Sequence, residues 1–175
     1  MQSIPPEVMD YLSSNDSLLR AQLFQRYPNL QQTLDDPSTR NAVLGWLAGG
    51  EAWEEKMTHF TMNCLKYLRA KATADESQII RSFLLHPDSH VRLAAYEHLL
   101  TLYYPDKNRE ALVQLLQNMF TDNEEALRVE AARYATQAGV GAELKGFLVQ
   151  WRKLAEAKGL GLMPSTELVD RLLNE

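Results

Sequence analysis

The sequence predicts an all-α fold, a helical solenoid of antiparallel helix pairs, and three observations lead to this prediction. A pattern of apolar helix, Asp and second helix occurs at 84–95 and again at 119–131, with Arg92 and Arg128 lying 36 positions apart. A repeat of this length, built from paired helices, is typical of solenoids. The chain contains 28 Leu but only 11 Ile and Val together, which favours helices over sheets. None of its 8 glycines lies in 51–138, which indicates helices separated by Asp, Asn and Pro turns.

Turn and cap signals define the helices of the first part of the chain. Pro5 and Pro6 suit the first turn of a helix. Ser38 suits the N-cap of a helix that ends at Gly49 and Gly50. A long helix is then predicted for 51–72, because a stripe of apolar residues recurs there at steps of three or four: Trp53, Met57, Phe60, Cys64 and Leu68.

The middle of the chain carries the repeated pattern. The helix that follows the long one is ended by Pro87, and Asp88 or Ser89 caps the next, which runs to about Tyr104. After the break at Pro105, two further helices are predicted. The first carries a run of Leu residues and Met119, and the second spans 124–138.

Glycines divide the last part of the chain. A turn at 139–141 precedes an amphipathic helix with Leu144, Phe147, Leu148, Trp151 and Leu154 on one face. Pro164 and Ser165 begin a final helix, which brings the prediction to roughly ten helices. This last helix either folds onto the helix of Trp151 as a cap or forms an edge that pairs with another chain. We expect the cap.

The repeated Asp and Arg have a physical interpretation. The Asp accepts hydrogen bonds from the free N–H groups that open the second helix. The Arg, one turn later, is placed to reach such an Asp in its own or a neighbouring unit, and Asp88 and Arg92 have the spacing of an intrahelical pair.

These residues resemble HEAT repeats. The phrase 86–95, His-Pro-Asp-Ser-His-Val-Arg-Leu-Ala-Ala, is close to the family's order of Asp, Val-Arg and Ala, and 127–131 is the second copy. A degenerate third copy lies at 36–43, although Arg40 is 52 positions before Arg92. The resemblance implies a right-handed superhelix that works as a binding surface, without catalytic residues.

The resemblance also divides the chain. We expect one domain over 1–175, with degenerate N-terminal helices at 1–74, two clear repeats at 75–138 and capping helices at 139–175.

Composition restricts the partner and the compartment. The net charge is −5 and the pI is about 5.4, whereas nucleic-acid binders need a positive footprint. The one cysteine, Cys64, cannot form an internal disulfide, which fits a reducing compartment. Residues 1–6 contain no basic residue and no apolar core, so we expect no secretory signal. No apolar run approaches the roughly 20 residues of a membrane span. The sequence therefore predicts a cytoplasmic protein.

Candidate reactive residues have structural explanations. Cys64 lies on the apolar stripe and diverges from His59, five positions away, so we expect it in the core. His86 and His90 have the spacing of zinc ligands, but Pro87 breaks the helix between them. We therefore predict no metal, no cofactor and no enzymatic activity.

Clustered charges and aromatic residues also have structural explanations. The glutamates of two first turns suit the helix dipole better than acid–base chemistry: Glu51, Glu54, Glu55, Glu124 and Glu125. A basic patch for phosphate would need several cations in one groove with Tyr67, namely Lys66, Arg69, Lys71 and Arg81. The adjacent pair Tyr103 and Tyr104 ends a helix, so at least one ring should point outward.

The predicted function is a non-enzymatic scaffold or adaptor that binds a protein or peptide. In HEAT repeats the second helix of each pair lines the inner face, which points to exposed residues of 89–104 and 124–138. The candidates are His90, Glu97, Tyr104, Glu130, Arg133 and Gln137.

Two alternatives remain from fold resemblance. The first is a nucleic-acid-binding HEAT-like protein of the DNA-base-repair type. It needs cations on successive second helices, and of Arg92, Arg128 and Arg133 the first two have structural roles. The second is a lyase or chaperone-like role on a cofactor-bearing protein.

Overall fold

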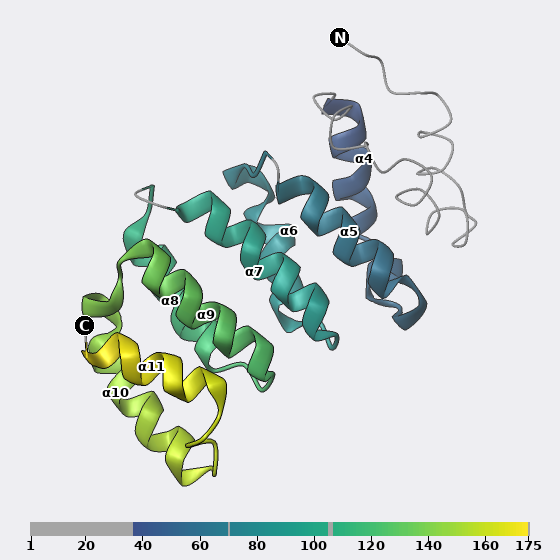
Figure 1. Ribbon diagram of the computed structural model, residues 1–175. Helices are drawn as coiled ribbons and strands as arrows, with labels where there is room; N and C mark the ends of the chain where they lie inside the picture. The colour runs from purple at the N-terminus through teal and green to yellow at the C-terminus, as the bar shows by residue number, and fades with distance from the viewer. Residues whose placement is uncertain (1–36, 70, 105–106, 175) are drawn as a thin grey trace. The chain divides into compact units, whose positions relative to one another are not determined.

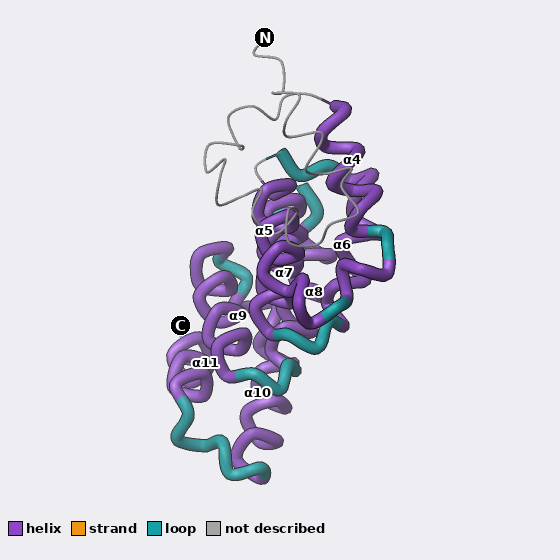
Figure 2. Tube along the Cα trace, turned by 90° about the vertical axis from the view of Figure 1, so that its right-hand side faces the viewer, coloured by secondary structure: helices purple, strands orange, loops and turns teal. Residues whose placement is uncertain are grey.

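All regular structure in the described residues is helical (Figures 1 and 2). The computed structural model describes residues 37–69, 71–104 and 107–174. These residues form eight α-helices and four short 3₁₀ helices and contain no strand, which confirms the all-α class. The predicted helix start at Pro5 and Pro6 lies outside them. The chain divides into two compact units, Met1–Leu102 and Tyr103–Glu175, and each is described by itself.

Unit 1 is built around aliphatic and aromatic side chains from four α-helices. Val43, Phe60, Cys64, Ile80 and Leu99 are all buried. The elements in chain order are α4 (Pro37–Leu47), η1 (Gly50–Trp53), η2 (Glu55–Met57), α5 (Thr58–Arg69), η3 (Ala74–Glu76), α6 (Ser77–Ser82), η4 (Phe83–Leu85) and α7 (Ser89–Tyr103).

The long helix predicted for 51–72 is wrong at its beginning, because α5 begins only at Thr58. Glu54 has an extended backbone, with φ −73° and ψ 136°, and separates two short 3₁₀ helices. The hydroxyl of Thr61 donates to the carbonyl of Ala52 over 2.8 Å and fixes this segment against α5. Trp53 therefore leaves the apolar stripe and stacks on Phe83, with ring centroids 5.3 Å apart.

Asp88 caps the second helix of the first copy as predicted, and the Arg of each copy binds the turn before its own helix. The Asp88 carboxylate accepts from the backbone N–H of His90 at 2.8 Å and of Val91 at 3.2 Å. Arg92 donates through Nη1 to the carbonyls of His86 and Pro87, both at 2.9 Å.

The second copy repeats this contact, since Nη1 of Arg128 donates to the carbonyl of Asp122 at 2.7 Å. Its sequence neighbour Glu125 is its carboxylate partner, with Nη2 of Arg128 2.8 Å from Oε2 of Glu125. Each Arg thus satisfies carbonyls of the turn that positions its own helix.

Arg40 of the third copy does not repeat the contact of Arg92 and Arg128. Arg40 of α4 donates to the carbonyls of Leu68 and Lys71 and forms an ion pair with Glu76. These partners lie 28 to 36 positions later in the chain, not in a preceding turn. Arg40 therefore joins α4 to the end of α5 and to η3.

Unit 2 consists of two helix pairs. Its helices are α8 (Arg109–Phe120), α9 (Glu125–Ala138), α10 (Gly141–Ala157) and α11 (Pro164–Asn174). Within the pairs, α8 packs against α9 and α10 against α11; between the pairs, α9 packs against α11 and α10 against α8. The last helix thus folds onto the helix of Trp151, as expected, and also contacts α9.

The turn between the pairs depends on a glycine. Gly139 has φ 61° and ψ 38°, the left-handed conformation that ends helices at low steric cost. Its N–H donates to the carbonyl of Thr136, and the N–H of Val140 donates to the carbonyl of Ala135.

None of the described helices is long and apolar enough to cross a membrane.

Candidate interaction surface

The six predicted partner-binding residues fall on both units. His90 and Glu97 lie on α7, in unit 1. His90 is exposed, and its Nδ1 lies 3.5 Å from Asp88. Glu97 forms an ion pair with Arg69 at 2.8 Å, and Arg69 also donates to Thr101 at 3.1 Å. Glu97 is therefore tied to α5 and is less available than the sequence suggested.

The other four candidates come together on unit 2. Glu130, Arg133 and Gln137 lie within about 60° of one another around α9, because each residue advances the helix by about 100°. Arg133 and Glu130 form an ion pair at 2.9 Å. The hydroxyl of Tyr104 donates to the carbonyl of Gln137 over 3.2 Å, and 40% of Tyr104 is exposed. We call these four residues the α9 face.

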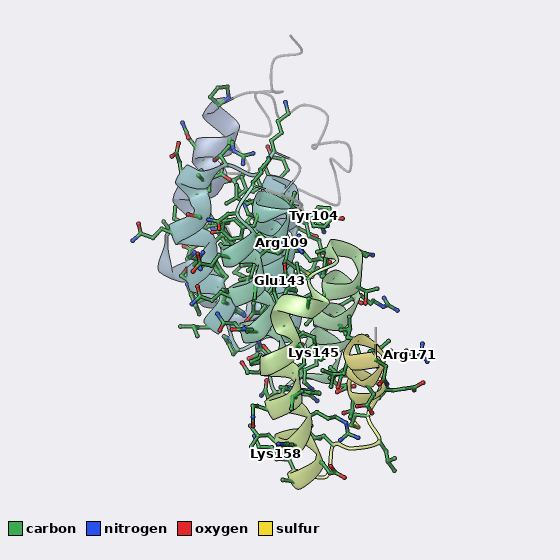
Figure 3. All side chains as sticks on the ribbon, turned by 90° about the vertical axis from the view of Figure 1, so that its left-hand side faces the viewer. Tyr104, Arg109, Glu143, Lys145, Lys158 and Arg171 are labelled. Carbon is green, nitrogen blue, oxygen red and sulfur yellow. The ribbon has the colours of Figure 1, made fainter. Side chains whose placement is uncertain are left out.

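Arg109 and Glu143, which the sequence reasoning missed, form an ion pair at 2.5 Å, and Arg109 also donates to the carbonyl of Gly139 at 2.9 Å. The hydrogen bond from Arg109 holds the pKa of Glu143 below its ordinary value. Tyr104, Arg109 and Glu143 follow one another along one side of unit 2 (Figure 3).

The cations of α9 and α11 are all paired. Arg128 bonds Glu125 and Arg133 bonds Glu130 on α9, and Arg171 of α11 bonds Glu167 at 2.6 Å. Arg171 is labelled in Figure 3. Because each positive charge has an acidic neighbour, these two helices present alternating charge and not a positive stripe.

A hollow of about 410 Å³ opens in unit 2 beside the α8–α9 turn. Its residues come from the end of α8, the turn, the first part of α9, the second half of α10 and the segment that follows α10: Phe120, Thr121, Asp122, Asn123, Arg128, Trp151, Leu154, Ala155, Lys158 and Leu160. The indole N–H of Trp151 donates to the carbonyl of Phe120 over 2.7 Å. Leu154 was predicted on the apolar face of an amphipathic helix, and it is 60% exposed at the edge of this hollow.

Glu125 joins α9 to the start of α11. Its Oε2 accepts from Arg128 and from the hydroxyl of Ser165 at 2.8 Å, and its Oε1 accepts from the N–H of Ser165 at 2.7 Å. From its position in the first turn of a helix, the sequence predicted that Glu125 stabilises the helix dipole. No local signal indicated the bond to Ser165, 40 positions later.

A buried polar cluster lies in unit 1. Glu76 is 3% exposed and His98 is fully buried, with Nε2 of His98 3.6 Å from Oε2 of Glu76. Burial lowers the pKa of His98, while the Glu76 carboxylate acts in the opposite direction. The cluster links α7 to Arg40 of α4 through Glu76.

The positions of the other candidate reactive side chains indicate structural roles. Cys64 is buried as predicted, and burial raises the pKa of its thiol well above the ordinary value. His86 is buried beside Trp53, whereas His90 is exposed. In the described part of the chain, no three His, Cys, Asp or Glu side chains form a group that could hold a metal.

The basic groove considered around Tyr67 does not form. Tyr67 is 3% exposed, and Arg69 is held by Glu97. The aromatic ring that would line such a groove is therefore part of the core.

Comparisons of the chain with protein families, with curated proteins and with solved structures find no match. The likeness to HEAT repeats stays a prediction from the sequence of residues 75–138.

Proposed function

We propose that this chain is a non-enzymatic, cytoplasmic scaffold or adaptor of HEAT-like architecture that binds a protein or peptide through the α9 face. The packing of unit 2 supports this proposal. The first helices of its two pairs, α8 and α10, contact each other, and so do the second helices, α9 and α11. Such contacts between equivalent helices are what a right-handed solenoid of helix pairs requires.

The observation that carries the proposal is the pairing of the cations on α9 and α11. A surface that binds nucleic acid displaces counterions with unneutralised Lys and Arg side chains. Arg133 and Arg171 instead face Glu130 and Glu167. Arg128 is committed to Glu125 and to a turn carbonyl. An alternating surface of this kind suits a protein partner, whose own charges it can match.

The test is affinity capture of the full chain from a lysate of its native cells, divided into two halves, one treated with nuclease. The proposal predicts a stoichiometric protein partner in both halves. It also predicts that Arg133→Glu, which places like charges beside Glu130, reduces the captured partner several-fold. Lys153→Glu makes the same charge change at an exposed position of α10 and should leave capture unchanged.

A third variant distinguishes an effect of charge on partner binding from an effect on folding. The exchange Glu130→Arg with Arg133→Glu keeps an ion pair but reverses its direction, so it should fold normally and still lose the partner. Partners that vanish with nuclease, or nucleic acid in the untreated half, would contradict the proposal and favour the DNA-binding alternative.

A further inference from the structure

The hollow beside the α8–α9 turn has the size of a small binding site. Its volume of about 410 Å³ lies near the lower end of the roughly 300–1,000 Å³ of ligand pockets. This space holds one large side chain with its flanking backbone. None of the four residues of the α9 face lines it.

The inner wall of the hollow is apolar. Phe120 is fully buried, Trp151 is 8% exposed, and their ring centroids lie 5.8 Å apart. The Trp151 N–H is already bonded to the Phe120 carbonyl, so the indole offers its ring and not a donor. Leu154 adds an aliphatic edge that water now covers over 60% of its surface. These walls suit an aromatic or large aliphatic group.

The charges around the hollow determine which chemical group of a ligand can lie beside its aromatic or aliphatic group. Arg128 is committed to Glu125 and to the Asp122 carbonyl. The Asp122 carboxylate accepts from the N–H of Glu124. Lys158 is exposed and has no carboxylate partner among residues 37–69, 71–104 and 107–174. Lys158, labelled in Figure 3, supplies a positive charge at the hollow that can pair with a ligand carboxylate.

We infer that this hollow is a docking site for a peptide segment of a partner protein, in which an aromatic or large aliphatic side chain stands next to a carboxylate. The apolar side chain fills the space between Trp151 and Leu154, and the carboxylate pairs with Lys158. The inference shares with the proposed function only that the partner is a protein.

The experiment pans a displayed library of random peptides against the full chain, with counter-selection against the double variant Leu154→Asp/Lys158→Glu. The expected peptides share an apolar side chain followed or preceded within two positions by Asp or Glu. Enrichment of peptides without this pattern, binding to the double variant as well, or no enrichment would overturn the inference.

Binding of one enriched peptide, measured by fluorescence anisotropy, then separates the two parts of the site. Leu154→Asp and Lys158→Glu should each weaken binding at least tenfold, while Lys153→Glu, on the same helix but outside the hollow, should not change it. Replacing the peptide's acid with Lys should abolish binding to the wild type and restore it in Lys158→Glu. Equal effects of Lys153→Glu and Lys158→Glu would refute the charge assignment.

A variant of the α9 face distinguishes this inference from the proposed function. Arg133→Glu should leave the peptide's affinity unchanged, although it reduces capture of the partner from lysate. Loss of peptide binding in Arg133→Glu would show that the peptide occupies the α9 face and not the hollow.

Discussion

Replacing Glu125 with Ala should release the start of α11 from α9. The carboxylate accepts the N–H and the hydroxyl of Ser165, at 2.7 and 2.8 Å, and two hydrogen bonds from Arg128, at 2.8 and 3.1 Å. Ser165 is 1% exposed and the Arg128 side chain 7%, so water does not readily replace the lost acceptor. Glu125 thus acts as an N-terminal cap for a helix that begins 39 positions later, at Pro164.

The magnitude follows from these contacts. Loss of a helix cap costs about 1 kcal/mol, and loss of hydrogen bonds to a charged group about 1.5–3 kcal/mol. We therefore expect local stability at α11 to fall by about 2–4 kcal/mol. This is a drop of roughly 30- to 1,000-fold in the protection of its amides from hydrogen exchange.

The assay is native-state hydrogen exchange followed by mass spectrometry, with Glu124→Ala as the matched control. Glu124 is adjacent and exposed, and its side chain makes no capping bond. Its removal should change protection by less than about 0.5 kcal/mol. Unchanged protection of α11 in Glu125→Ala, or an equal change in both variants, would refute the reasoning.

Three further predictions concern unit 1. Arg40→Met leaves the nearly buried Glu76 without its cation and should lower the free energy of unfolding by about 3–5 kcal/mol in urea denaturation; a change below about 1 kcal/mol would contradict this. Burial lowers the pKa of His98 from its ordinary 6.5, so the unfolded chain binds the proton more readily. The free energy of unfolding should therefore be intact above pH 6.5 and fall as the pH drops toward the lowered pKa of His98. This fall should be smaller in His98→Gln. The exposed control His90→Gln should show the same fall as the wild type. Burial and the raised pKa should keep the Cys64 thiol from reacting with a disulfide reagent at pH 8 until the chain unfolds, and rapid native labelling would disprove this.

Local signals in the sequence were sufficient for several helices. Asp88 and the apolar period after it predicted α7, and Gly139 predicted the end of α9. These features depend on residues within a few positions of one another, where cap and propensity rules apply.

Contacts between distant residues could not be predicted from one sequence. Trp53 has the spacing of the α5 stripe, but its ring finds Phe83, 30 positions later, and the helix begins after it. The partners of Arg109 and Glu125 lie 34 and 40 positions later. Leu154 has an apolar pattern around it, yet the turn that it borders leaves it exposed. The hollow, which depends on such contacts, was therefore missed.

The most direct test of a protein partner on the α9 face is site-specific photocrosslinking. A photoreactive amino acid at Gln137 is compared with one at Gln114, an exposed position of α8, in nuclease-treated lysate. A protein partner bound to the α9 face should give one protein adduct at Gln137 and little at Gln114. Equal yields at both positions, or an adduct to nucleic acid in untreated lysate, would contradict it.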